Sequence, residues 1–215
     1  MSDVSVPVGA VALEGSLALP AHAGGVVVFS HGSGSGRHSP RNRYVAGALR
    51  DAGIATLLLD LLTEEEDRDG ERRFDIALLT ERLGDAVRFV ERHASTRTLP
   101  LGLFGASTGA ASALRVAAAM PRTVRAVVSR GGRPDLAGRS VLAGVRAPTL
   151  LLVGGADEGV VELNEAARQE MRHAECELVR VPGATHLFEE PGALEQVARL
   201  ATAWFERHLA LVHER

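Results

Sequence analysis

Apolar runs that alternate with segments of helical spacing constrain the fold of this chain more than any other feature of its sequence. The runs are continuous, which is typical of strands that helices cover on both faces. They occupy residues 25–29, 54–59, 99–104, 124–129, 149–153 and 177–181, and helical spacing occurs at 41–52, 74–93, 108–120, 160–173 and 194–208. The short β-leaning segments VSVPV and AVALEGSLALP precede them. Together they predict an α/β fold, a mostly parallel twisted sheet of about eight strands with helices on both faces.

One domain accounts for the whole chain. A length of 215 residues suits a single core, and no repeat, low-complexity tract or linker divides it, so we expect residues 1–215 to form one domain. The connection from Arg130 to Ala147 is only 18 residues long, too short for a large cap domain. The acidic run TEEEDRDGERR at 63–73 is interpreted as a solvated loop, with a mobile flap at the rim of the site as the alternative.

Charge and composition exclude several kinds of chemistry. The net charge is −3 with acids and bases interspersed, so no basic stripe is available for a nucleic-acid backbone. All 24 basic residues are arginine, which excludes Schiff-base and pyridoxal chemistry and the phosphate lysine of a Walker loop. The one cysteine, Cys176, lies in the alternating segment ECELVRV and is interpreted as a buried structural thiol.

The expected location in the cell follows from two absences. The segment MSDVSVPVGA lacks the basic start of a signal peptide. No apolar run approaches the roughly 18 residues that a membrane helix needs. We therefore expect a cytoplasmic protein without a membrane partner.

The glycine-rich loop SHGSGSGR, which follows the first buried strand, raises the question of a dinucleotide site. That fingerprint needs glycines at the spacing G-x-G-x-x-G. Counting from Gly32 and Gly34, the third place holds Arg37, and counting from Gly34 and Gly36 it holds Ser39. Both registers fail, so nucleotide binding is not expected.

Two histidines in the same loop, His31 and His38, suggest a metal pair. No acid or cysteine lies beside them at ligand spacing, so the sequence predicts no metal site and no cofactor. His31 is interpreted as a structural residue of the loop.

The segment GASTG lies between an apolar strand and a helix rich in small residues. A serine that acts as a nucleophile must project from a tight, strained turn at the carboxyl end of a central strand. Small residues two places before and after it, here Gly105 and Gly109, let the helix approach the strand closely. Ser107 is therefore the candidate nucleophile.

A serine hydroxyl is a weak nucleophile and needs a base, which needs an orienting acid. In LLLVGGADEGV, Asp157 comes just after a strand, and in VPGATHLF, His186 lies in the loop after the last strand. The order serine, acid, histidine has separations of 50 and 29 residues, and all three fall at carboxyl ends of strands. Glu158, next to Asp157, is the alternative acid.

On GASTG, the GGAD turn and GATHLF, the chain resembles the α/β-hydrolase superfamily, and within it the small, lidless dienelactone hydrolase-like branch. The resemblance covers nearly all 215 residues. It implies that Ser107 is the nucleophile, that His186 is first general base and then general acid, and that Asp157 holds the imidazole. It also implies a small-molecule ester as substrate and no cofactor.

The resemblance also assigns a role to the glycine-rich loop. In that family the corresponding loop supplies one oxyanion donor within an HG-x sequence, here His31, Gly32 and Ser33. The backbone amides of Ser33 and Thr108 would then face the oxyanion, each contact worth roughly 3 kcal/mol. One departure is that dienelactone hydrolases typically carry cysteine where this chain has Ser107.

We therefore expect a serine hydrolase of ester, thioester or lactone bonds. The alternatives are a dienelactone hydrolase proper and a catalytically silent hydrolase fold that acts as a ligand receptor. Arg130, directly after a strand on the side of the site, and Arg37 are either surface or salt-bridged residues or ligands of a carboxylate on the substrate.

Overall fold

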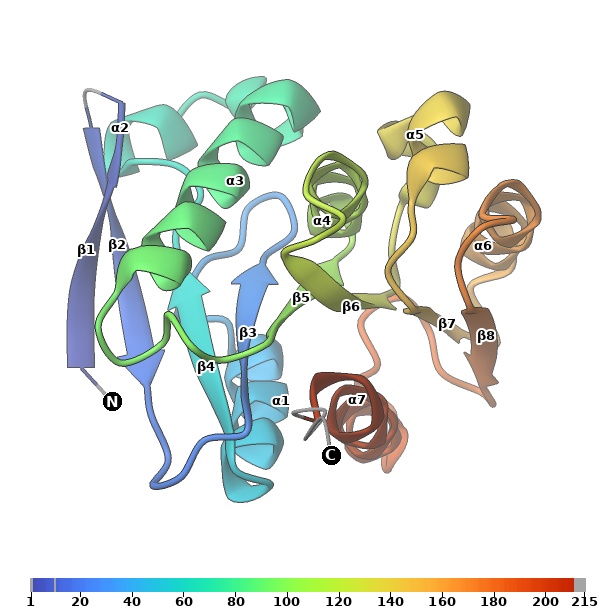
Figure 1. Ribbon diagram of the computed structural model, residues 1–215. Coiled ribbons are helices and arrows are strands. Elements are labelled where there is room, and N and C mark those ends of the chain that lie inside the picture. Colours follow the sequence, from blue (N-terminus) through green and yellow to red (C-terminus); the bar gives the residue numbers. More distant parts are fainter. Residues whose placement is uncertain (1, 10, 211–215) are drawn as a thin grey trace.

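The computed structural model describes residues 2–9 and 11–210. They form one sheet in the order β1-β2-β4-β3-β5-β6-β7-β8 (Figure 1). The strands are β1 Ser2–Val8, β2 Val11–Ala18, β3 Gly25–Ser30, β4 Ile54–Leu59, β5 Leu101–Ala106, β6 Val124–Arg130, β7 Thr149–Gly154 and β8 Cys176–Val181. β2 runs antiparallel to β1 and β4, and all other pairs are parallel. This confirms the predicted α/β fold with a mostly parallel sheet of eight strands.

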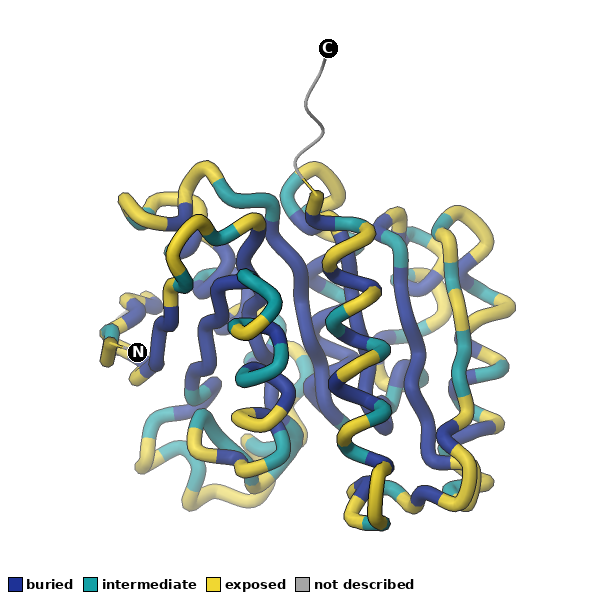
Figure 2. The backbone as a smooth tube through the Cα atoms, turned by 90° about the horizontal axis from the view of Figure 1, so that it is seen from below, coloured by how far each residue is buried: buried dark blue, intermediate teal, exposed yellow. Residues whose placement is uncertain are grey.

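Helices cover both faces of the sheet. The long ones are α1 Pro40–Asp51, α3 Ile76–Arg92, α4 Thr108–Ala119, α6 Glu158–Glu170 and α7 Ala193–Leu209. α1 and α7 lie on one face, whereas α3, α4 and α6 lie on the other (Figure 1). Two apolar clusters fill the space between helices and sheet, one on each face. The central strands run through the interior, where Figure 2 shows them as buried.

Four of the six continuous apolar runs form fully buried strands, whereas the run at 177–181 lies in the edge strand β8, of which only Val181 is buried. Every residue of β3, β4, β5 and β7 is buried, because each of these strands has helices on both faces. The order of the strands reverses at β3, which has β4 on one side and β5 on the other. In open α/β sheets the crevice at the carboxyl ends of the strands beside such a reversal gathers ligands. A ligand site is therefore expected at the loops after β3 and β5.

The expectation of a solvated loop at residues 63–73 holds in part, because most of these residues are exposed but the segment also forms helical turns. This segment contains α2 Glu64–Asp67 and the 3₁₀ turn η1 Arg72–Phe74. Thr63 and Glu66 form a capping box, in which each side chain accepts a hydrogen bond from the other residue's amide. Glu66 also forms an ion pair at 2.8 Å with Arg82, which is 8% exposed. The T-x-x-E spacing of a capping box was present in the sequence.

The connection between β6 and β7 does not form a cap. It contains the 3₁₀ turn η2 Pro134–Ala137 and helix α5 Arg139–Gly144. Both pack against α4 and α6, along the face of the sheet (Figure 1). The site at the carboxyl ends of the strands is therefore left uncovered by this connection, as its length predicted.

Two smaller expectations concern chemistry away from the site. Cys176 begins β8, and burial raises the pKa of its thiol to about 11, so the thiol stays protonated at neutral pH. Its Sγ lies 3.9 Å from Sδ of Met171, which fits a structural role. Within residues 2–9 and 11–210, no helix combines the length and the apolar character needed to cross a membrane.

Candidate active site

Ser107 occupies a strained turn between β5 and α4. Its φ of 51° and ψ of −121° lie in a region that a residue with a side chain rarely adopts, at a cost of about 1–3 kcal/mol. Hydrogen bonds hold the turn: the Ser107 amide donates to the Arg130 carbonyl at 3.1 Å, and the Arg133 amide donates to the Ser107 carbonyl at 3.0 Å. The end of β6 thus fixes the serine in a conformation that projects its side chain from the sheet.

The two glycines of GASTG are required because a side chain at either position would clash with neighbouring atoms. A Cβ on Gly105 would lie 2.5 Å from Cα of Ala110, and a Cβ on Gly109 would collide with the carbonyl oxygen of Ser30. Helix α4 therefore begins in direct contact with both β5 and β3. This close approach places the start of α4, with its free amides, beside Ser107.

The structure brings Ser107, His186 and Asp157 together. Nδ1 of His186 lies 2.7 Å from Oδ2 of Asp157, and Nε2 lies 3.3 Å from Oγ of Ser107. With the proton on Nδ1, the imidazole donates to the carboxylate and presents the lone pair of Nε2 to the serine hydroxyl. Glu158 is the exposed first residue of α6, and the hydrogen bond from the imidazole goes to Asp157 instead.

The loop that carries His186 is tied to the end of β7. The Ala156 amide donates to the Ala184 carbonyl at 2.9 Å, and the amide of Thr185 donates to Glu190 at 3.1 Å. A Cβ on Gly154 would collide with the Ala184 carbonyl, so only glycine lets the loop pack this closely. The side chain of His186 is 38% exposed, and the site opens to solvent.

The loop after β3 lies against the serine, but one of its amides is already bonded. A Cβ on Gly32 would lie 3.1 Å from Cβ of Ser107. The Ser33 amide, which the resemblance assigned to the oxyanion, donates at 2.9 Å to Oγ1 of Thr108. The Thr108 amide has no acceptor among the described residues. Of the two amides expected at the oxyanion, the Thr108 amide is therefore free, whereas the Ser33 amide is bonded to a side chain that the sequence analysis missed.

His31 supports this loop. Its Nε2 accepts the Leu61 amide at 2.9 Å, which places the ring proton on Nδ1, and Nδ1 lies 2.9 Å from the Gly32 carbonyl. Burial lowers the pKa of His31, against the opposing effects of the Gly32 carbonyl and of Asp60 and Asp67. A neutral, buried imidazole thus connects the loop after β3 with the loop after β4.

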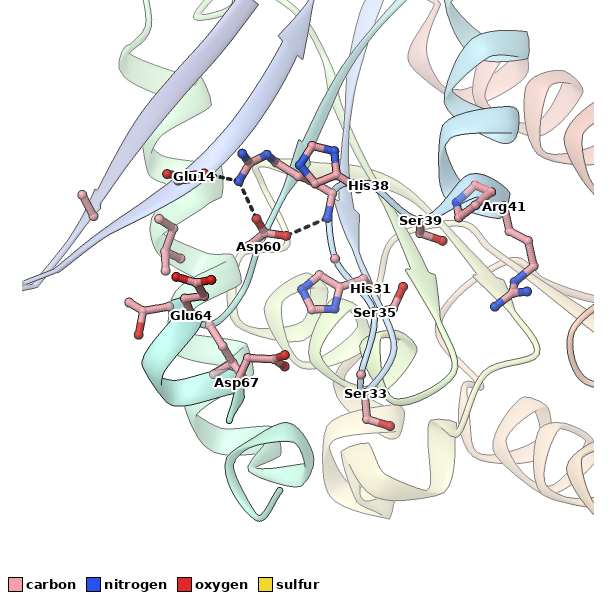
Figure 3. Close-up of a pocket in the computed structure, with 18 residues that line it drawn as sticks. Glu14, His31, Ser33, Ser35, His38, Ser39, Arg41, Asp60, Glu64 and Asp67 are labelled. Atoms are coloured by element: carbon pink, nitrogen blue, oxygen red, sulfur yellow. Dashed lines mark hydrogen bonds and ion pairs between the residues drawn. The ribbon is translucent and has the colours of Figure 1, made fainter. Parts of the chain in front are cut away.

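Arg37 forms ion pairs within the protein through its guanidinium. It forms ion pairs with Glu14 at 2.5 Å and with Asp60 at 2.6 Å, and its amide donates to Asp60 at 2.7 Å (Figure 3). Two carboxylates therefore already neutralise this cation. Of the two interpretations of Arg37, the structure favours the salt-bridged one, and we do not propose it as a substrate ligand.

Arg130 is the opposite case. It ends β6 and is 8% exposed, and its Nε and Nη1 are buried without a hydrogen-bond partner in the described part of the chain. Burial, and then the nearby positive charge of Arg41, lowers the pKa of Arg130 to about 10. The guanidinium is still charged at neutral pH, so a buried cation without a carboxylate lies next to the turn that carries Ser107.

A pocket of about 860 Å³ opens beside Ser33 (Figure 3). The loop after β3 forms one wall, and β2, the end of β4 and α2 form the others. Its charged lining comprises Glu14, Arg37, Arg41, Asp60, Glu64 and Asp67. Carboxylates outnumber arginines there, and three of these four acids lie on β2 and α2.

A metal site has no support in the described ranges 2–9 and 11–210. Groups of three or more histidine, cysteine, aspartate or glutamate side chains that could hold a metal ion are absent from them. His38 lines the pocket, but the nitrogens of His31 are both engaged in the hydrogen bonds described above.

Known hydrolases are similar to this chain in sequence and in fold. The model of the hydrolase family described as serine aminopeptidase, S33, matches residues 21–133. The crystal structure of a dienelactone hydrolase from Anabaena variabilis is 54% identical, with a TM-score of 0.93, and the match covers 97% of each chain. Est1E from Butyrivibrio proteoclasticus is 16% identical with a TM-score of 0.84, and the match covers 98% of this chain and 100% of that one. At that identity the likeness concerns the fold alone.

Two curated relatives carry a different name. Proteins from two strains of Mycobacterium tuberculosis, each named as a phosphoribosyl transferase, are 60% identical to this chain over 208 residues. The match covers 96% of this chain and 46% of each relative. The chain therefore spans about half the length of these relatives, and their name describes the longer proteins.

Proposed function

This chain belongs to the α/β-hydrolase superfamily, in its dienelactone hydrolase-like branch, and from this premise we propose that it hydrolyses esters or related acyl bonds through an acyl-serine intermediate. One observation carries the proposal. The serine hydroxyl, the imidazole and the carboxylate form a continuous chain, with 3.3 Å from Ser107 to His186 and 2.7 Å from His186 to Asp157. Each distance suits the role that a triad needs.

The proposed reaction uses these groups in sequence. Oγ of Ser107 attacks the acyl carbon as Nε2 of His186 takes the hydroxyl proton, and the carbonyl electron pair moves onto oxygen. When the carbonyl re-forms, the bond to the leaving group breaks and the imidazolium protonates that group. Water then attacks the acyl-serine by the same steps, so that the acid is released and Ser107 regains its proton. Asp157 stabilises the imidazolium throughout.

The open site supports small, soluble substrates. In the part of the chain that the structure describes, no connection covers the site, and the imidazole is partly exposed. The reaction of the dienelactone hydrolase from Anabaena variabilis is the nearest alternative, since that protein is 54% identical over nearly the whole chain. A silent fold that only binds a ligand is a weaker alternative, because it gives no reason to retain the strained turn at Ser107.

We expect a fluorophosphonate probe to label the protein once, at Ser107, because only an activated and exposed serine reacts with it. The same protein should hydrolyse a short nitrophenyl ester without any added cofactor. Mass spectrometry of the digest locates the adduct, and absorbance of nitrophenolate reports hydrolysis. If the protein were neither labelled nor active, the silent fold would be favoured. An adduct at another serine would assign the nucleophile to that residue instead.

The proposed substrate class is anionic, with its charge on the side of Arg130. Leaving a charge buried without a partner is costly, and Arg130 has none in the described part of the chain. A carboxylate on the substrate would accept from Nη2, the one guanidinium nitrogen that is not among those enclosed without a partner, and would neutralise the buried charge. The pocket beside Ser33 has more carboxylates than arginines, so it would repel an anionic group. We therefore assign the uncharged part of the substrate to that pocket.

Replacing Arg130 by methionine is expected to reduce the preference for an anionic ester over a neutral one. The test compares kcat/KM for mono-nitrophenyl glutarate with that for nitrophenyl valerate, whose acyl chain has equal length. Loss of a charge-assisted hydrogen bond of about 1.5–3 kcal/mol lowers the ratio roughly tenfold to a hundredfold. Arg125→Met, at the exposed opposite end of β6, is the control. An unchanged ratio in Arg130→Met would assign the guanidinium a purely structural role.

A further inference from the structure

The side chain of Thr108, the residue after the nucleophile, has no role in the triad. Thr108 begins α4 and is 4% exposed. Its Oγ1 accepts a hydrogen bond of 2.9 Å from the Ser33 amide, which connects the loop after β3 to α4. The amide that would be expected to face the oxyanion is thus bonded to a hydroxyl.

That hydroxyl still has a hydrogen to donate. A threonine hydroxyl offers one hydrogen and two lone pairs, and the Ser33 amide uses one lone pair. In helices, threonine often donates to the carbonyl four residues earlier. Here that residue is Phe104, inside strand β5, and among the described residues no hydrogen bond is formed in which Oγ1 of Thr108 is the donor. In the described part of the chain this hydrogen is therefore not used by another group.

The hydroxyl also lies in the right place. It belongs to the neighbour of Ser107, and it bonds to the neighbour of Gly32, where an added Cβ would lie 3.1 Å from Cβ of Ser107. The Thr108 amide is the first of α4 and has no acceptor in the described part of the chain. Thr108 thus carries two donors, an N–H and an O–H, that have no acceptor in the described part of the chain and lie next to Ser107.

On the basis of the proposed hydrolase function, we propose that the Thr108 hydroxyl is the second donor of the oxyanion hole and that the Ser33 amide acts through it. When Ser107 attacks, the carbonyl electron pair moves onto oxygen, and the Thr108 N–H and O–H both donate to this oxyanion. The hydroxyl keeps its proton, and no bond to it forms or breaks. An O–H that accepts from an amide is polarised and donates more strongly, so Ser33 assists without touching the substrate.

The decisive comparison is between Thr108→Val, which removes the hydroxyl at nearly constant shape, and Thr108→Ser, which keeps it. Removing one oxyanion donor lowers kcat by about 10²- to 10³-fold, and we expect a loss of this size in Thr108→Val. The KM of this variant should stay within about threefold of wild type, because the donor acts on the transition state. Thr108→Ser should retain most of kcat. Thr96→Val is the matched control, since Thr96 is also buried and hydrogen-bonded, to the Val90 carbonyl, outside the site.

A second readout separates catalysis from structure. A trifluoromethyl ketone forms a tetrahedral, oxyanion-bearing adduct with a serine, so its inhibition constant should weaken in Thr108→Val by about the same factor as kcat/KM. If Thr108→Val does not fold, Thr108→Ser and Thr108→Ala differ by the hydroxyl alone and give the same comparison.

Three outcomes would overturn the inference. Wild-type or higher kcat in Thr108→Val would mean that the Ser33 amide itself binds the oxyanion and that the hydroxyl competes for it. Equal losses in Thr108→Ser and Thr108→Ala would assign the effect to the methyl group, which both variants lack, and equal losses in Thr108→Ser and Thr108→Val would mean that retaining the hydroxyl does not preserve kcat. An inhibition constant that does not change in parallel with kcat/KM would assign it to a step other than oxyanion formation. A wild-type protein without hydrolase activity would instead remove the proposed function.

Discussion

Replacing Ser107 by alanine is expected to lower kcat for ester hydrolysis by about four to six orders of magnitude and to abolish labelling by a fluorophosphonate. The reason is that alanine retains the turn and the start of α4 but has no oxygen to form the acyl intermediate. His186→Ala should cause a loss of similar size, since the serine at 3.3 Å then lacks its base. The measurement is initial rate with a nitrophenyl ester, together with mass spectrometry of the labelled protein.

The double variant makes this prediction more stringent. Groups that act as one unit give losses that do not add, so Ser107→Ala combined with His186→Ala should be about as inactive as Ser107→Ala alone. Ser112→Ala is the control, because Ser112 is a buried serine of α4, the helix that follows Ser107, and its hydrogen-bond partners are Ser30 and Gly109. Full activity in Ser107→Ala would exclude the proposed mechanism.

The parts of this molecule that could be predicted are those that depend on local spacing. GASTG requires glycine on both sides of Ser107 because α4 lies against two strands there. This constraint involves only five consecutive residues, so the sequence pattern was enough to predict it. The order of Asp157 and His186 was readable because each follows a strand, and parallel strands end at one edge of the sheet. The sheet itself followed from continuous apolar runs.

The parts that could not be predicted depend on pairs distant in the chain. The partners of Arg37 are Glu14 on β2 and Asp60 after β4, and no sequence pattern connects them. The same holds for the hydrogen bond from Ser33 to Thr108, residues that lie 75 positions apart. The absence of a partner for Arg130 is also a property of the folded surroundings. Tertiary packing decides these contacts, and it is not encoded in local pattern.

Asp157→Asn is expected to lower kcat by about four orders of magnitude while leaving the fold nearly intact. An asparagine side chain can donate to Nδ1 of His186, which then holds its proton on Nε2 and cannot accept one from Ser107. Folding should be little affected because the Asp157 carboxylate makes no capping hydrogen bond to α6, and asparagine is equally suited to that position. The measurement is kcat with a nitrophenyl ester beside a thermal unfolding curve.

Glu158→Gln is the matched control, since it also converts one carboxylate to an amide, at the adjacent residue. Glu158 is exposed at the start of α6, and the imidazole bonds to Asp157 at 2.7 Å, so this change should leave kcat within about twofold of wild type, as is usual for surface substitutions. If Glu158→Gln caused the large loss and Asp157→Asn did not, the acid of the triad would be Glu158. The difference between the variants would then require the loop that carries His186 to rearrange during catalysis, because among the described residues the hydrogen bond of Nδ1 of His186 goes to Asp157.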